Sequence, residues 1–341
     1  MESWLLHQWY ESATPAWWLR PPGFLFRVLV VIRHCLYQAG ILQAKRLPIP
    51  VVVVGNLTVG GTGKTPLTLA LVEELRRRGW TPGILSRGYG AQAREVRAVT
   101  AGSPPADVGD EPALMASLSD CPVWVGRNRF DAGRALLQAH PGVNVLVCDD
   151  GLQHLALARD MEIVVVDGER FWGNGHLLPA GPLREPLSRL STVDAVVVQG
   201  RVTERESLLP REIPCYSMTL EGQCWSGMEP SDRHYPLDHF TGQSCHAVAG
   251  IGNPQRFFRY LGTLGIDVRP HPFPDHHPFK QEDLCFEPEL PILTTEKDGI
   301  KCRNFAPQSS FMLSVKAVPE AGFFEKVQEV LTRRVHGRTS A

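Results

Sequence analysis

Residues 49–65 read IPVVVVGNLTVGGTGKT, a β-branched run that leads into a glycine-rich turn and a Gly-Lys-Thr triplet. The apolar run, residues 49–54, predicts a short strand that is buried on both faces, as in a parallel sheet. Apolar residues then recur at helical spacing over 67–75, and Gly79 suits the end of a helix. Strand, glycine-rich turn and helix in this order are the context of a phosphate-binding loop. The sequence therefore predicts an α/β fold with a doubly wound, mostly parallel sheet of the P-loop NTPase type.

The glycine-rich turn supplies groups that bind nucleotide phosphates. Glycines let successive backbone N–H groups converge on phosphate oxygens, and the N-terminus of the following helix adds its dipole. Lys64 is expected to reach the β- and γ-phosphates of a nucleotide, and the Thr65 hydroxyl is expected to ligate Mg²⁺. The predicted nucleotide-binding residues are Thr58, Val59, Gly60, Gly61, Thr62, Gly63, Lys64 and Thr65.

The loop departs from the usual P-loop pattern at one position. The pattern G-x-x-x-x-G-K-[ST] has glycine where this chain has Thr58. The core of residues 60–65 resembles the variant loops of partition-type ATPases and metal-insertion GTPases, although Val59 stands where those proteins often carry a signature lysine. A P-loop GTPase or ATPase switch of the metallochaperone or partition type is therefore the alternative function. A glycine turn that binds nothing is the structural alternative.

A second predicted strand ends in carboxylates. Residues 143–148 read VNVLVC and lead into Asp149 and Asp150. Ligands bind at the C-terminal ends of the strands in doubly wound sheets, and Mg²⁺ prefers oxygen ligands. Asp149 or Asp150 is therefore the expected second partner of Mg²⁺, directly or through water. A polar turn before Gly151 is the alternative.

Two adjacent carboxylates, Asp110 and Glu111, lie between a glycine and a proline. At a helix start they need have no further role, but in a phosphotransferase a carboxylate orients the attacking hydroxyl and accepts its proton. The basic candidates for contact with a phosphate or an anionic substrate are Arg87, Arg127 and Arg129, which could equally be ordinary surface charges.

The N-terminal segment, residues 1–46, is rich in tryptophan and punctuated by cations. Four of the eight Trp lie in it, at positions 4, 9, 17 and 18. Spanning a bilayer takes about 20 mostly apolar residues, and Arg27 and Arg33 interrupt the apolar stretch here. Read as a helix, the stretch is amphipathic, and Trp rings favour the headgroup level of a membrane. The segment is predicted to associate with a membrane surface; an ordinary packed helix is the alternative.

The composition limits the class of protein. The chain has 341 residues, of which 43% are hydrophobic and 21% charged, so it is neither disordered nor a polytopic membrane protein. Its formal net charge of −1 argues against a basic nucleic-acid binder. The eight cysteines form no C-x-x-C pair, which indicates reduced thiols rather than a metal or disulfide framework.

Six motifs occur in one order along the chain, and together they resemble one family. They are VGNLTVGGTGKTP at 54–66, LSRGYG at 85–90, GDEP at 109–112, DDGLQH at 149–154, LPAGPLRE at 178–185 and TTEKD at 294–298. This combination is similar to the tetraacyldisaccharide 4′-kinases, the lipid A 4′-kinases of Gram-negative bacteria, over nearly the whole chain.

The resemblance implies an activity and a place in the cell. It implies transfer of the γ-phosphate of ATP, with Mg²⁺, to the 4′-hydroxyl of a tetraacyldisaccharide 1-phosphate, which gives lipid IVA. It also implies a peripheral or monotopic protein on the cytoplasmic face of the bacterial inner membrane. The expected partners are the acylated disaccharide lipid and that leaflet, with no nucleic acid and no protein partner.

The resemblance also assigns roles by motif. Asp110 is the expected base with Glu111 beside it, and Lys64, Asp149 and Asp150 complete the catalytic group, with Thr65 and Asp149 at the metal. The residues assigned to substrate or phosphate are Arg87, Tyr89, Arg129 and His154. His276, in the segment PDHHP, is assigned to the nucleotide, although adjacent histidines are also typical of an ordinary surface.

Since a single hydrophobic core rarely grows beyond about 250–300 residues, the chain is predicted to divide into domains. The membrane-associating segment 1–46 precedes a P-loop kinase domain at 47–157. A second, smaller α/β domain at 158–320 is expected to close over the nucleotide. A final helix at 322–335 is expected to pack back on the kinase domain.

Overall fold

The structure of the protein is a computed structural model, which describes residues 2–12, 14–90, 95–200, 209–228 and 233–339. Within these residues, thirteen strands form one continuous sheet. The strand order is β11-β10-β12-β13-β8-β7-β6-β1-β5-β2-β4-β3, with β9 paired to β8. All neighbours run parallel except the pairs β13–β8, β4–β3 and β8–β9. The predicted fold class, a mostly parallel α/β sheet, is confirmed.

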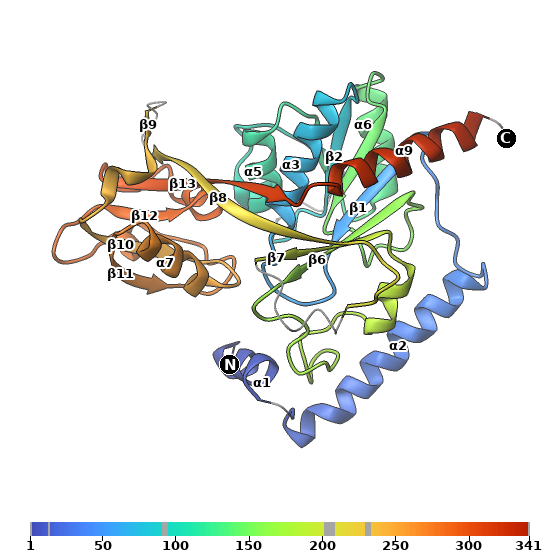
Figure 1. Cartoon of the computed structure of the whole chain (residues 1–341), viewed down its shortest axis with the longest axis horizontal. Helices are drawn as coiled ribbons and strands as arrows, with labels where there is room; N and C mark the ends of the chain where they lie inside the picture. Colours follow the sequence, from blue (N-terminus) through green and yellow to red (C-terminus); the bar gives the residue numbers. More distant parts are fainter. Residues whose placement is uncertain (1, 13, 91–94, 201–208, 229–232, 340–341) are drawn as a thin grey trace.

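The body of the molecule is built around the phosphate-loop strand (Figure 1). Its strands are β1 (Val51–Gly55), β2 (Pro82–Ser86), β3 (Arg97–Val99), β4 (Val123–Val125), β5 (Val145–Asp149), β6 (Met161–Asp167) and β7 (Ala195–Gln199). Its helices are α3 (Lys64–Arg77), α4 (Pro105–Val108), α5 (Asp110–Leu118) and α6 (Arg129–Ala139), with a 3₁₀ turn at Leu187–Thr192.

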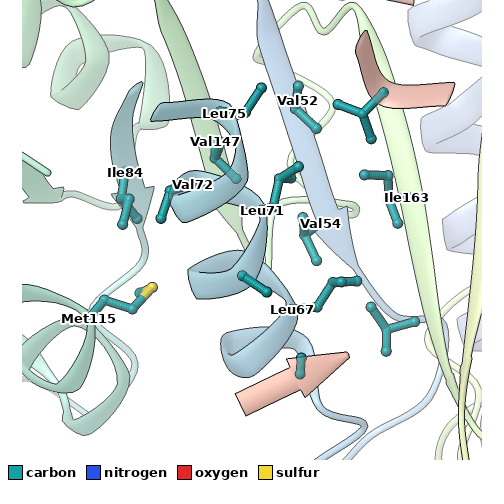
Figure 2. Close-up of a cluster of buried hydrophobic side chains, with 14 of the residues drawn as sticks. Val52, Val54, Leu67, Leu71, Val72, Leu75, Ile84, Met115, Val147 and Ile163 are labelled. Carbon is teal, nitrogen blue, oxygen red and sulfur yellow. The ribbon is translucent and has the colours of Figure 1, made fainter. Parts of the chain in front are cut away.

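Both faces of β1 are buried, which explains its unbroken valine run. Val52 and Val54 pack with Leu67 and Leu71 of α3 in one core cluster (Figure 2). Val51 and Val53 point to the opposite face, into a second cluster that contains Leu136 of α6. A strand buried on both sides needs apolar residues at every position rather than at every second one.

The second lobe extends from the body on a pair of long strands. It contains β8 (Cys215–Gly227), β9 (His234–Tyr235), β10 (Ser244–Ala249), α7 (Pro254–Thr263), β11 (Asp267–Pro272), β12 (Ile292–Thr295), α8 (Glu296–Cys302) and β13 (Ser310–Pro319), with 3₁₀ turns at Leu237–Phe240 and Gln281–Leu284. In Figure 1, β8 runs from the body into the lobe and β13 returns beside it. The two strands therefore connect the lobe to the body as an antiparallel ribbon.

The chain returns to the body after the lobe. Helix α9 (Phe323–Thr339) places Phe323, Val327 and Leu331 in the core cluster that contains β1 and α3. Strands β6 and β7 lie after residue 157, yet they continue the parallel sheet beside β1. The division into domains at residue 157 stays a prediction about folding units.

The N-terminal segment forms a helical strap along one side of the body (Figure 1). It consists of α1 (Glu2–Tyr10), a 3₁₀ turn at Trp17–Leu19 and α2 (Arg20–Gln38). The strap packs through its inner edge, where Trp9 and Gly23 are buried, and exposes large apolar side chains on its outer face. Among the residues that the structure describes, no helix is both long and apolar enough to cross a bilayer.

Candidate active site

The phosphate loop lies between the end of β1 and the start of α3, as the sequence predicts. Gly63 caps α3 with a φ of +87°, in the left-handed region that favours glycine. A Cβ added there would meet Gln199 Oε1 at 2.9 Å, so the position also has little space. Lys64 is buried at the first position of α3, and the Thr62 hydroxyl is buried without a hydrogen-bond partner in the described structure. The loop therefore presents hydrogen-bond donors that have no partner within the described structure and that can bind an anion.

The two carboxylates at the end of β5 reach the loop because β5 pairs in parallel with β1. Asp149 is fully buried, and its Oδ1 accepts a hydrogen bond from Thr68 Oγ1 at 3.0 Å. Asp150, with a φ of +48°, turns toward Lys64 Nζ at 3.6 Å and accepts a hydrogen bond from Arg184 Nη1 at 3.2 Å. The loop, the two carboxylates and Arg184 therefore form one charged group.

The environment separates the two carboxylates chemically. Burial, reinforced by the charge of Glu111, raises the pKa of Asp149 to about 7. Burial also acts on Asp150, but Lys64 and Arg184 outweigh it and lower the pKa of Asp150 below its ordinary value. Asp150 is therefore the firmly ionised member of the pair.

The donor set beside the loop fits Mg²⁺. Asp149 Oδ2 is buried without a hydrogen-bond partner in the described structure, beside the P-loop strand, and Thr65 offers a hydroxyl at the start of α3. No preformed cluster of three His, Cys, Asp or Glu side chains occurs among the described residues. Mg²⁺ commonly takes one or two protein oxygens and completes its shell with phosphates and water, so the Asp149 and Thr65 oxygens are a sufficient donor set.

Asp110, the predicted base, is the first residue of α5 and meets the second lobe. The preceding Gly109 has a φ of +95°, and a Cβ there would meet the Tyr89 carbonyl oxygen at 2.8 Å. Asp110 Oδ2 accepts a hydrogen bond from His276 Nδ1 at 3.2 Å and lies 3.7 Å from Lys301 Nζ. Burial alone would raise the pKa of Asp110, but His276 and Lys301 lower it below its ordinary value. Asp110 is thus ionised and ready to accept a hydrogen bond from a hydroxyl.

His276 was assigned to the nucleotide, and the structure places it against the candidate base. Its ring also lies 5.3 Å from the ring of Tyr89, which is exposed. Three predicted site residues from different parts of the chain, Tyr89, Asp110 and His276, are therefore neighbours. Direct contact of His276 with the nucleotide stays a prediction.

The sequence analysis missed the lysines that complete this group. Lys297 Nζ lies 3.2 Å from Glu111 Oε1 and 3.4 Å from Asp275 Oδ1. Burial would lower the pKa of Lys297, but Glu111 and Asp275 raise it above its ordinary value. The available signal was the TTEKD motif, which begins in the last two residues of β12. Polar residues at the end of a parallel strand lie at the ligand-binding edge of the sheet.

The predicted substrate residues form a basic group around the Asp149–His154 turn. Arg129 is only 2% exposed, and its Nη2 donates to the Asp150 carbonyl oxygen at 3.4 Å. Its backbone N–H donates to His154 Nε2 at 3.4 Å, while Arg87 is exposed. Burial, together with the charges of Arg129 and Arg159, lowers the pKa of His154 to about 4. The group therefore has positive charge to offer an anion, and binding of the substrate by Arg87, Tyr89, Arg129 and His154 stays a prediction.

The lowered pKa of His154 makes the stability of the protein depend on pH in a way that can be measured. Between pH 4 and its ordinary pKa of 6.5, His154 takes up a proton in the unfolded chain but not in the folded one. Its contribution to the free energy of unfolding is complete above that range and is lost as the pH falls through it. We expect His154→Gln to flatten the decrease in melting temperature between pH 7.5 and pH 5, with the exposed His140→Gln as the control. An identical pH slope in wild type and His154→Gln would contradict this.

A cavity of about 240 Å³ lies between the body and the second lobe. Its lining includes the loop residues 61–66, Glu111 beside the base, and Lys297 from the lobe. Much of the remaining wall is apolar and aromatic: Leu69, Leu114, Leu220, Ile251, Phe257, Tyr260, Leu313 and Val315. Phosphate donors at one wall and an apolar remainder suit a nucleotide, whose base is flat and apolar on its faces.

Comparisons with known proteins agree with this site. The family model for tetraacyldisaccharide-1-P 4′-kinase matches residues 15–332. The tetraacyldisaccharide 4′-kinase of Methylobacillus flagellatus is 46% identical over 97% of this chain and 96% of its own length. The one from Azoarcus sp. is 48% identical over 98% of this chain and 96% of its own.

A solved structure extends the likeness to three dimensions. It is described as the "apo" form of LpxK from Aquifex aeolicus in complex with ATP. It has a TM-score of 0.76 and 32% identity, and the match covers 92% of this chain and 97% of that one. The resemblance drawn from the six motifs is thereby confirmed, and this chain belongs to the tetraacyldisaccharide-1-P 4′-kinase family.

Proposed function

We propose that the protein transfers the γ-phosphate of ATP, in the presence of Mg²⁺, to the 4′-hydroxyl of a tetraacyldisaccharide 1-phosphate and so produces lipid IVA. The observation that carries the proposal is the composition of the cavity, in which the phosphate loop faces Glu111 and Lys297. The neighbouring Asp110 then lies at the edge where an acceptor hydroxyl would meet the γ-phosphate. The relatives named tetraacyldisaccharide 4′-kinase match this chain over nearly their whole length.

Different residues of the site have different roles in phosphoryl transfer. The loop N–H groups and Lys64 hold the phosphates, and Thr65 with Asp149 would hold Mg²⁺, which screens the phosphate charge when it is bound. Asp110 accepts the hydrogen bond of the 4′-hydroxyl and aligns it. It takes the hydroxyl proton as the new P–O bond forms, while the bond from the γ-phosphorus to the β,γ-bridging oxygen breaks and ADP leaves. His276 and Lys301 keep Asp110 ionised and fix its orientation. Arg129 and Lys64 supply positive charge where negative charge gathers in the transition state.

The geometry favours a kinase over a GTPase switch. A guanine-reading loop needs a free carboxylate in an N-K-x-D segment, and the nearest match here is TTEKD. In that segment Asp298 is fully buried, accepts the backbone N–H of Gly250 at 2.8 Å and pairs with Lys301 at 2.7 Å. Lys297 is likewise paired with Glu111. The carboxylate of this segment is therefore already engaged inside the lobe and is not free to read a guanine base.

The direct test uses the full chain and the lipid. Purified protein is incubated with ATP, Mg²⁺ and tetraacyldisaccharide 1-phosphate in detergent micelles, and the lipid is analysed by mass spectrometry. The expected product is heavier by one phosphate, and its formation needs both ATP and Mg²⁺. Folded protein that yields no such product would refute the proposal. Stronger thermal protection by GTP than by ATP would favour the switch instead.

We propose further that the strap binds the cytoplasmic face of the inner membrane. Its outer face exposes Trp17 by 79%, Phe24 by 69% and Leu29 by 57%. Trp4 of α1 and Trp18 of the 3₁₀ turn stack with ring centroids 5.4 Å apart. A continuous exposed apolar face of this kind is costly in water and typical of a monotopic helix. Such a position would bring the site to a lipid that stays in the leaflet.

The membrane proposal predicts the effect of one charge. Leu29→Glu should lower partitioning onto vesicles that contain anionic lipid by about tenfold or more, because a buried leucine is worth roughly 1.5–3 kcal/mol and a carboxylate is repelled. Leu118→Glu, at an exposed leucine of α5, is the matched control and should partition like wild type. Equal loss in both variants, or none in either, would contradict the proposal. Sedimentation with vesicles measures it.

A further inference from the structure

The strap, consisting of α1, the Trp17–Leu19 turn and α2, does more than expose apolar side chains. Its inner edge carries polar side chains that reach the loops of the active site. An anchor alone would need only the outer face and a covalent connection to the body. The inner contacts therefore call for a separate explanation.

Tyr10, at the end of α1, contacts the phosphate loop directly. Its hydroxyl donates to the Val59 carbonyl oxygen at 3.2 Å, while the Val59 N–H donates to the Pro182 carbonyl oxygen at 2.9 Å. Both polar groups of Val59 are thus held immediately before Gly60 and Gly61. Burial raises the pKa of Tyr10 to about 12, so its hydroxyl keeps the proton that it donates. The end of α1 is itself docked, because the Trp9 carbonyl oxygen accepts the backbone N–H of Asn174 at 2.7 Å.

Tyr10 also contacts an arginine that holds the second lobe beside the phosphate loop. The Arg170 guanidinium lies over its ring at 5.0 Å and donates through Nη1 to the Gly252 carbonyl oxygen at 2.6 Å. Gly252 belongs to the second lobe and sits so close to the loop that a Cβ on it would lie 2.3 Å from the Gly61 nitrogen. The tyrosine ring therefore supports the arginine that holds the lobe against the loop.

Helix α2 reaches the other loops of the site through consecutive residues. Arg33 Nη2 donates to the Gln153 carbonyl oxygen at 2.8 Å, and Gln153 Nε2 donates to the Asn56 carbonyl oxygen at 3.0 Å. His34 Nε2 lies 2.8 Å from Glu185 Oε1, a carboxylate whose side chain is only 3% exposed. Glu185 follows the arginine that holds Asp150.

We infer that Tyr10, Arg33 and His34 are positioning residues of the kinase reaction, through which the strap holds the phosphate loop and the Asp149–His154 turn in their working geometry. The inference rests on the proposed function. None of the three acts on the reacting atoms; they act through Val59, Gln153 and Glu185. A strap docked on the body therefore orders the site, and a strap that is displaced loosens it.

The experiment separates positioning from anchoring. Tyr10→Phe removes one hydroxyl and keeps the ring under Arg170, and Tyr37→Phe makes the same change on α2, where the hydroxyl has no hydrogen bond within the described structure. For each full-length variant we would measure the Kd of ATP with Mg²⁺ by calorimetry, kcat and the KM values for ATP and lipid in micelles, partitioning onto anionic vesicles, and melting temperature.

The expected result is a split between these readouts. Tyr10→Phe should lower kcat/KM for ATP and weaken ATP binding by about 3–10-fold, the size of one lost hydrogen bond, with vesicle partitioning and the KM for lipid unchanged. Tyr37→Phe should match wild type throughout. His34→Ala should lower kcat, and His34→Gln, which can still donate to Glu185, should recover most of it.

Two outcomes would overturn the inference. One is a Tyr10→Phe variant with wild-type ATP affinity and kcat. The other is a loss of partitioning in Tyr10→Phe with unchanged ATP affinity, because Tyr10 would then serve the anchor alone. If the wild type transfers no phosphate, the proposed function fails, while the comparison of ATP affinities still decides this inference.

Discussion

Asp110→Asn is expected to lower kcat for phosphoryl transfer by about 10²–10⁴-fold, the range of general-base contributions in enzymes. The amide keeps the volume and can still hydrogen-bond to His276, but it cannot accept the proton of the 4′-hydroxyl. ATP affinity should change little, because Asp110 is not among the residues that line the nucleotide cavity. Rapid-mixing kinetics with saturating ATP, together with the Kd of ATP, separate the two effects.

A carboxylate on the helix before α5 provides the control for this variant. Asp107 pairs only loosely with Arg97, at 4.0 Å, so Asp107→Asn should retain wild-type kcat. A second variant, His276→Gln, should lower kcat by less than Asp110→Asn, since the histidine orients the base and does not accept the proton. Wild-type kcat in a folded Asp110→Asn protein would remove Asp110 from the role of base.

Lys64→Met should lower kcat by at least about 10²–10³-fold, the cost of removing one preorganised transition-state donor, and should weaken ATP binding as well. Lys64 is 8% exposed and lies 3.6 Å from Asp150, so its charge acts in a site with little water to screen it. Methionine keeps an unbranched side chain that is one atom shorter, so the main change is the loss of the charge and its donors. Calorimetry with ATP and the micelle assay measure both effects.

The Lys64→Met substitution should also change how the folded protein binds protons, which is a second measurable effect. Lys64 acts to lower the pKa of both Asp149 and Asp150, so its loss should make the folded protein without ligand bind protons more readily. Lys326→Met on α9, where the lysine pairs with Glu329 at 3.2 Å, is the control and should leave ATP binding unchanged. Unchanged ATP affinity and kcat in Lys64→Met would contradict the assignment of the phosphate loop.

The two variants test different halves of one arrangement. Lys64 belongs to the body, at the start of the helix that follows the phosphate loop. Asp110 also belongs to the body, but its charge state and orientation come from His276 and Lys301 in the second lobe. The charge state and orientation of the base therefore depend on two side chains that the second lobe supplies.

The sequence of the N-terminal strap left its environment open between a membrane surface and the protein body. The sequence was compatible with a membrane-associating segment and with a packed helix. The structure shows packing at the inner edge, through Trp9 and Gly23, and exposure on the outer face, through Trp17 and Phe24. A spacing pattern cannot say which side of a helix meets the protein, because that depends on the body it lies against.

The sequence by itself determined the features that depend on neighbours along the chain. The local sequence specifies a strand, a loop and a helix through the valine run, the glycine turn and Lys64-Thr65. Asp149 and Asp150 stand at the end of a second parallel strand, and such strands end at the same edge of the sheet as the loop. The predicted base also lies where its Gly-Asp-Glu-Pro turn begins a helix.

Only the tertiary structure decided which distant groups complete the site. His276 meets Asp110 across 166 positions of the chain, Lys297 meets Glu111 across 186, and Tyr10 meets Val59 across 49. Hydrogen bonds and ion pairs act over a few ångströms and depend on orientation, whereas periodicity reports only burial and local geometry. The pairing of strands and the docking of the lobe and strap bring these atoms within reach, and that is information that no local spacing contains.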